Sequence, residues 1–122
     1  ETDDVMNEND ERIIKHINKI VNCIPDKNDG HQRELIKILN KLDLPDEYEG
    51  KVFDICMNLW EDITKSPSIR MTAFKFIYKL SKKHKELLNE IEHLTQDHYI
   101  ESLSPGIKNS IKRMILDLEK LK

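Results

Sequence analysis

Glycine, proline and cysteine are scarce in this sequence. Its 122 residues include three Gly, four Pro and two Cys, whereas 35% are charged. Few helix-breaking residues together with many Lys, Glu, Ile and Leu favour helices over sheets, and strand-like alternation of apolar and polar residues is missing. We therefore expect an all-α protein. A Gly-rich phosphate loop and a nucleophile elbow are also missing, so the sequence offers neither of these catalytic motifs.

Metal-binding patterns are equally sparse. Neither Cys23 nor Cys56 has a second Cys or a His within four residues, which excludes a zinc-type pair. We expect two reduced thiols, with Cys56 in a core stripe. The segment EIEH places Glu90 and His93 three residues apart, as in half of a di-iron carboxylate motif, but no second copy occurs at a matching place. We expect a solvated charged face there, and we predict no metal, no cofactor and no catalytic residue.

Long hydrophobic runs are absent too. No apolar run approaches the roughly 20 residues that span a bilayer, and no charged-then-apolar leader opens the chain. We expect a soluble, cytoplasmic protein without membrane contact. The first residue is Glu1 rather than Met, so we expect that a start has been removed or that the chain is the C-terminal part of a longer protein. Residues 1–10 are acidic and polar and predict a flexible lead-in.

Apolar residues at helical spacing are abundant. From Arg12 onward they recur every three to four residues, with breaks at PDKNDG, DLPDE and TQDHYIES. The pattern predicts a single domain over residues 11–122, built from six helices in three antiparallel hairpins at about 11–42, 46–82 and 84–122.

Two of these predicted helices carry specific expectations. The helix at about 46–64 has an apolar stripe that includes Ile63, with Trp60 at the edge of the stripe. A short helix around 84–94 offers Leu87, Leu88, Ile91 and Leu94 to the core.

Two short segments nearly repeat each other at a spacing of 38: SPSIR at 66–70 and SPGIK at 104–108. In each, the serine predicts a helix N-cap and the proline a first-turn residue whose missing amide costs nothing. Phosphorylation of Ser66 and Ser104 is the alternative interpretation.

Shifting the chain against itself by 38 aligns three predicted helices. All twelve aligned positions are apolar, in the sets Leu35, Ile38, Leu39, Leu42; Ala73, Phe76, Ile77, Leu80; and Ile111, Met114, Ile115, Leu118. Helix pairs at such a period are typical of an α-α superhelix, or solenoid, in which each pair buries its apolar face against its neighbours.

The stretch from LPDEYEG to NEIEHL, followed by LSPGIKNSIKRMI, resembles the HEAT-like repeats of small bacterial proteins of unassigned activity. In those repeats a first helix ends in an acidic turn and a second opens with a small, an aliphatic and a basic residue. The resemblance implies a HEAT-like fold, with further helices upstream. HEAT repeats often show an Asp and an Arg at set places, and Asp62 and Arg70 resemble that pair. The first copy has Gln32 in the basic place and the third has Lys108.

Charge is distributed unevenly between the predicted layers. The second helices, taken as 31–42, 66–85 and 104–122, hold 14 Lys and Arg against 3 Asp and Glu, whereas the remainder holds 6 against 20. A formal net charge of −3 therefore conceals one strongly basic layer. In α-solenoids the second helices line the concave surface, so a basic groove is expected. Its predicted contact residues are Lys37, Arg70, Lys75, Lys79, Lys108 and Arg113.

Within that layer, Lys37, Lys75 and Arg113 follow each other at a spacing of 38, as do Gln32, Arg70 and Lys108. Both sets are expected away from the apolar stripes. Such a face can attract phosphates or an acidic protein surface, although a lysine-rich helix face is often only solvated.

Two functions are compatible with these patterns. The leading hypothesis is a non-enzymatic HEAT-like scaffold that binds an acidic protein surface along its basic second-helix face. The alternative is nucleic-acid binding, related in style to the HEAT-like DNA alkylation-repair proteins. Those enzymes use a Trp and an Asp on the concave layer, whereas the single Trp60 is predicted on a first helix, so glycosylase activity is not expected. The identity of the partner and the oligomeric state are left open.

Overall fold

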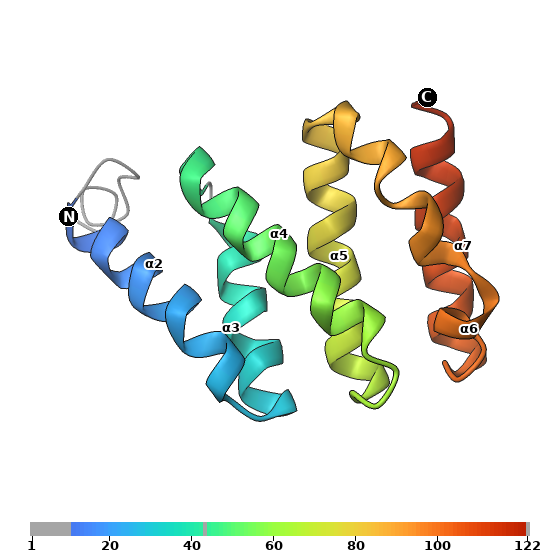
Figure 1. Ribbon diagram of the computed structural model, residues 1–122, viewed down its shortest axis with the longest axis horizontal. Helices are drawn as coiled ribbons and strands as arrows, with labels where there is room; N and C mark the ends of the chain where they lie inside the picture. The colour runs from blue at the N-terminus through green and yellow to red at the C-terminus, as the bar shows by residue number, and fades with distance from the viewer. Residues whose placement is uncertain (1–10, 43, 122) are drawn as a thin grey trace.

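The computed structural model describes residues 11–42 and 44–121, and it describes side chains from Lys15 onward (Figure 1). The predicted lead-in at 1–10 lies outside the described residues. Within the described part every regular element is a helix, and this confirms the all-α prediction. The long helices are α2 (Glu11–Cys23), α3 (Asp29–Lys41), α4 (Asp46–Glu61), α5 (Pro67–Lys83) and α7 (Pro105–Glu119). The short ones are η1 (Ile24–Asp26), η2 (Lys85–Asn89), η3 (Glu92–Thr95) and α6 (Asp97–Ile100).

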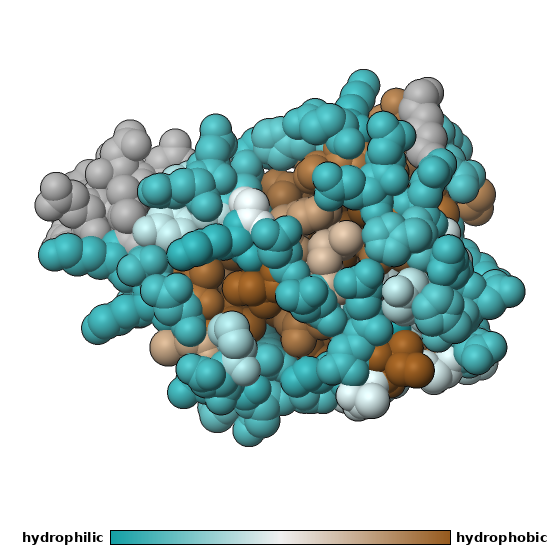
Figure 2. Space-filling model, viewed as in Figure 1, coloured by the Kyte–Doolittle hydropathy of each residue, from teal (hydrophilic) through white to brown (hydrophobic). Residues whose placement is uncertain are grey.

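The helices form two layers. Helix α5 packs against α3 on one side and α7 on the other, so these three second helices make one layer. Helices α2 and α4 contact each other and run diagonally across the second layer, and α4 packs closely on α5 (Figure 1). The face covered by α2 and α4 is mostly hydrophilic, with apolar residues visible in the gaps (Figure 2). The result is the predicted row of packed helix pairs.

The period of 38 residues is confirmed most directly by the N-caps of the second helices. The Ser66 hydroxyl accepts a hydrogen bond from the Ile69 amide at 3.4 Å, and the Ser104 hydroxyl does the same for Ile107 at 3.5 Å. Asn28 caps α3 in the same way, through a bond of 2.9 Å from the His31 amide. Asparagine is as good an N-cap as serine. The predicted start of this helix near residue 31 was therefore late by two residues, because the whole segment PDKNDG was interpreted as a break and Asn28 within it was not identified as the cap.

The core follows the predicted stripes best in α5, which has neighbours on three sides. The four predicted positions of this helix are all buried: Ala73, Phe76, Ile77 and Leu80. In α3 the prediction was partly wrong, because Ile36 and Leu39 are fully buried whereas Ile38 is 45% exposed. Gln32 completes the buried stripe of α3. Because Gln32 is polar, the apolar pattern did not identify it as a core residue, and the buried face of α3 was predicted incorrectly.

Around the turn after α4, two predictions were wrong. Ile63 is 51% exposed, and Trp60 is completely buried rather than at an edge. The Trp60 ring lies 4.8 Å from that of Phe74 between ring centroids, and its Nε1 donates to the Leu94 carbonyl at 2.9 Å. The distant carbonyl satisfies the indole donor, which allows the large side chain to enter the core.

The predicted α-helix at 84–94 was also wrong, because this arm consists of η2 and η3 followed by the short α6. Its buried residues are Leu88, Ile91 and Leu94. They are spaced by three, and in a 3₁₀-helix residues i and i+3 lie directly above each other. The same spacing is compatible with an α-helix over so short a stretch. The periodicity therefore identified the buried residues correctly and the helix type wrongly.

Candidate functional site

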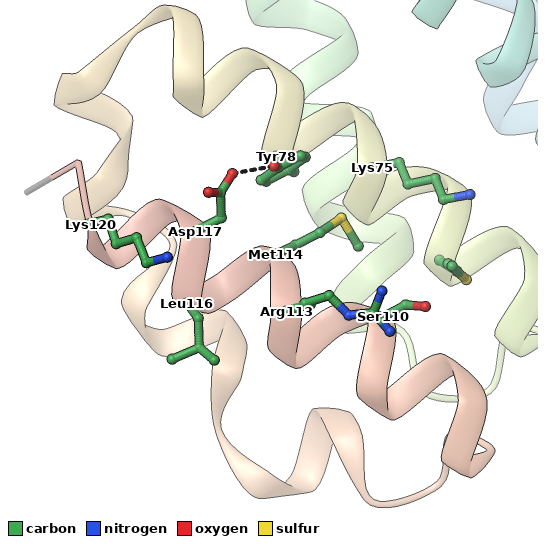
Figure 3. Close-up of a pocket in the computed structure, with 9 residues that line it drawn as sticks. Lys75, Tyr78, Ser110, Arg113, Met114, Leu116, Asp117 and Lys120 are labelled. Carbon is green, nitrogen blue, oxygen red and sulfur yellow. Dashed lines mark hydrogen bonds between the residues drawn. The ribbon is translucent and has the colours of Figure 1, made fainter.

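The outer face of α3, α5 and α7 carries two open grooves. The α3/α5 groove has a volume of about 340 Å³, and the α5/α7 groove has a volume of about 630 Å³ (Figure 3). Lys75 of α5 lines both grooves. Lys37 and Ile38 line the first from α3, and Arg113 lines the second from α7. The two grooves therefore adjoin each other along the middle helix.

Three of the predicted contact residues thus lie along one surface. Lys37, Lys75 and Arg113 are all exposed and come from successive second helices. Lys37 is 3.6 Å from the Glu34 carboxylate, but both side chains are more than half exposed, so this ion pair is weak. Within residues 15–42 and 44–121, Lys75 and Arg113 form no ion pair. Two cationic groups are therefore presented to solvent on either side of the α5/α7 groove.

The α5/α7 groove has apolar side chains on its floor. Tyr78 and Met114 lie between the two helices and pack against the core (Figure 3). Met71 also lines the groove, and Leu116 on α7 is 59% exposed. Leu116 also lines the groove, but from the side of α7 away from Met114, so an apolar side chain is exposed at the rim of the groove, where charged residues predominate on an ordinary solvated helix face.

One carboxylate lies within the α5/α7 groove. Asp117 accepts a hydrogen bond from the Tyr78 hydroxyl, and the Lys82 Nζ is 3.8 Å from the same oxygen. The hydrogen bond from Tyr78 lowers the pKa of Asp117, and the charges of Lys82 and Lys120 lower it further. Asp117 is therefore ionised and already engaged, so the unpaired charges of the groove are those of the basic residues.

Lys79 and Lys108 line neither of the two grooves. The Lys79 ammonium donates to the Asn40 carbonyl, which lies near the end of α3 and would otherwise lack an intrahelical partner. Lys108 is half-buried in the first turn of α7 and lines neither groove. Of the two, Lys79 is exposed, and its ammonium group joins α5 to α3.

The prediction that Arg70 lies on an exposed binding face was wrong. Its side chain is 1% exposed. Nε donates to the Trp60 carbonyl at 2.9 Å, Nη2 donates to the Tyr99 carbonyl at 2.6 Å, and Cζ lies 4.6 Å from the centroid of the Trp60 ring. Burial lowers the pKa of Arg70, and the charge of Asp62 opposes that shift. Arg70 therefore holds the repeat together and does not face a partner.

Gln32 occupies the place of Arg70 one period earlier and acts in the same way. It is buried, and its Nε2 donates to the Ile24 carbonyl at the end of the preceding first helix at 2.9 Å. Its Oε1 accepts from Lys65 at 3.1 Å. The set of Gln32, Arg70 and Lys108 was predicted to be a row on the surface. Instead, Gln32 and Arg70 are buried, and each donates a hydrogen bond to a backbone carbonyl at the end of the preceding first helix.

The Asp and Arg that resemble a HEAT pair are not directly bonded. Asp62 accepts from the Thr64 amide at 3.0 Å and from the Thr64 hydroxyl at 2.5 Å. These bonds lower the pKa of Asp62. Asp62 therefore stabilises the turn between α4 and α5, and Arg70 bonds to backbone carbonyls instead.

The described residues offer little chemistry beyond this surface. Glu90 and His93 do not share a helix, and His93 lies 3.2 Å from Glu61. No three His, Cys, Asp or Glu side chains of the described chain come together as ligands for a metal ion. Cys23 is exposed and Cys56 is buried, both as free thiols, and burial raises the pKa of Cys56. Within residues 11–42 and 44–121, no helix is both long enough and apolar enough to cross a bilayer.

Comparison with known families gives one result. A family model described as a HEAT repeat domain matches residues 2–118, which is nearly the whole chain. No curated protein and no solved structure gives a significant match.

Proposed function

Because the chain belongs to the HEAT repeat family, we propose that it is a non-enzymatic scaffold that binds an acidic protein surface through the outer face of α3, α5 and α7. Repeats of this family commonly mediate protein interactions. The observation that carries the proposal is the line of Lys37, Lys75 and Arg113 along two adjoining grooves. Such a line of like charge attracts a surface of opposite charge and fixes its register.

The proposed set of contact residues is smaller than the set that the sequence predicted. Lys37, Lys75 and Arg113 remain as the proposed contacts. Arg70 is excluded because it is buried, and Lys79 and Lys108 are excluded because they line neither groove. We also propose that the protein acts in the cytoplasm without membrane contact.

The test is affinity capture from native cell extract with the wild type and with Lys75→Glu plus Arg113→Glu. We expect the double variant to retain an acidic protein at least about tenfold less efficiently, because two attractive charges become repulsive. The matched control is Lys19→Glu plus Lys51→Glu, which changes the same charge at exposed positions on α2 and α4. An acidic complex that survives the first variant contradicts the proposal.

Nucleic-acid binding is the competing outcome of the same experiment. If the basic surface serves a duplex, the wild type binds DNA or RNA at low salt, and the logarithm of the affinity falls linearly with the logarithm of the salt concentration. Binding of a duplex that is lost in the Lys75→Glu plus Arg113→Glu variant, with no acidic protein captured, replaces the scaffold proposal.

A further inference from the structure

The α5/α7 groove combines two properties that a simple basic patch does not need. It has an apolar floor formed by Met71, Tyr78 and Met114, and it has the basic residues Lys75, Arg113 and Lys120 around that floor. A polyanion requires only the charges. An apolar floor is useful only to a partner that also buries apolar side chains.

The spacing of the lining residues indicates the shape of that partner. On α5, Met71, Lys75 and Tyr78 lie at i, i+4 and i+7, so they share one face over two turns. On α7 the lining extends from Ser110 to Lys120, which at 1.5 Å per residue is about 15 Å. Two helices packed side by side leave a groove into which the ridge of a third helix fits.

The exposed Leu116 adds a specific contact. It lies on α7 between Arg113 and Lys120, at i, i+3 and i+7, so an apolar side chain has a basic residue one turn to either side. Because its side chain is 59% exposed, Leu116 buries little apolar surface when this chain folds. Met71 and Met114 are flexible and polarizable, and such side chains adapt to varied apolar partners.

We propose that the α5/α7 groove binds an acidic amphipathic helix of a partner protein, about three turns long. Its apolar residues, at i, i+3 or i+4 and i+7, pack on Tyr78 and Met114 on the floor and extend to Leu116 at the rim of the groove. Its flanking Asp and Glu residues lie against Lys75, Arg113 and Lys120. This inference rests on the proposed function, because it names the kind of acidic surface that the same face binds.

The test measures binding of labelled 18-residue peptides to the full chain by fluorescence anisotropy at low salt. The first peptide has Leu at i, i+3, i+4 and i+7 and Glu on the remaining face. The second has the same composition with the leucines rearranged so that no face is apolar. The third has Ser in place of every Leu of the first, so its length and charge are the same and it has no apolar residue. We expect the first peptide to bind at least about tenfold more tightly than the other two, because only it can bury leucines on the groove floor.

Two matched variants separate the apolar contact from the charge. Leu116→Ser is expected to weaken binding of the amphipathic peptide by about tenfold and to leave the other two unchanged. Ile63→Ser removes a similarly exposed aliphatic side chain on the turn after α4, outside the groove. We expect it to leave the binding of all three peptides unchanged. Lys75→Glu plus Arg113→Glu is expected to weaken the binding of every acidic peptide.

Each remaining outcome has a definite meaning. If all three peptides bind equally and depend on Lys75 and Arg113, the groove inference is overturned and the acidic-surface proposal stands. Binding of the first peptide that Leu116→Ser does not change also overturns the inference. If no peptide binds, the inference fails, and the extract experiment alone decides the proposed function.

Discussion

The second and third hairpins have matching second helices but very different first arms. In the second hairpin, α4 is a continuous helix that packs along α5. In the third, the corresponding arm is divided among η2, η3 and α6. Two side chains of the second hairpin donate hydrogen bonds to carbonyls of that arm, Trp60 to Leu94 and Arg70 to Tyr99. The irregular arm therefore depends on its neighbour for the backbone partners that a regular helix supplies itself.

Removing Arg70 should break this dependence and have the largest effect on stability. Arg70→Ala leaves the Trp60 and Tyr99 carbonyls without their charged donor, and we expect the free energy of unfolding to fall by about 3–4 kcal/mol. Urea denaturation followed by circular dichroism measures the loss. Hydrogen exchange should show that amides of residues 85–100 lose more protection than those of α4.

Lys75→Ala is the matched control for Arg70, because it removes an exposed basic side chain five residues further along the same helix. We expect it to change the free energy of unfolding by less than about 0.5 kcal/mol. If Arg70→Ala accelerates exchange equally in both hairpins, the arm at 85–100 is not held in place by Arg70.

The N-caps sharpen the comparison at the point where the two hairpins agree. Ser66→Ala and Ser104→Ala should each lower the free energy of unfolding by about 1 kcal/mol, because each removes the acceptor for an amide in the first turn. Thermal or urea denaturation checks this. Asn28→Ala tests whether the first repeat behaves alike, since Asn28 occupies the same place one period earlier. Unchanged stability in both serine variants would contradict the stabilising role of these two caps.

The sequence predicted the repeat well, because the repeat is encoded locally. Ser66 and Ser104 with their following prolines define two helix starts, and the apolar stripe of α5 defines its buried face. A cap or a stripe involves residues within a few positions of each other, so pattern and spacing are enough to find it.

The errors share a different cause, which is contact between distant parts of the chain. Arg70 was predicted to be exposed because it is basic, and its burial depends on the Tyr99 carbonyl 29 residues later. Trp60 likewise depends on Leu94. Such partners are backbone groups and leave no trace in side-chain patterns. In the candidate site, the spacing of 38 identified Lys37, Lys75 and Arg113. Of the apolar residues in the α5/α7 groove only Met114 was noted, as a core residue, and Met71, Tyr78 and Leu116 were missed.

The smallest predicted effect concerns the contact between the two arms of each hairpin at the end opposite the turn. In the second hairpin, buried Glu49 of α4 accepts from Lys83 at 2.7 Å and lies 3.0 Å from the His84 ring. One period later, the places of Glu49 and Lys83 are taken by Leu87 and Leu121, which pack against the core. A titratable contact therefore joins the two helices of the second hairpin, whereas the corresponding side chains of the third are both apolar and pack against the core.

Burial acts to raise the pKa of Glu49, but the hydrogen bonds from Lys83 and His84 outweigh it, and the pKa is lowered. A lowered folded-state pKa means that the carboxylate stabilises the fold above its unfolded pKa of about 4.3, and that this contribution is lost as pH falls through the folded-state value. Because Lys83 is half exposed, we expect Glu49→Gln to cost only about 0.5 kcal/mol at pH 7, with the difference from wild type vanishing in acid. Urea denaturation between pH 7 and about pH 3 measures this, and Glu47→Gln, an exposed neighbour on α4, is the control. A cost that persists unchanged in acid would mean that Glu49 contributes by packing and hydrogen bonding rather than by its charge, and that charge would then not distinguish the second hairpin from the third.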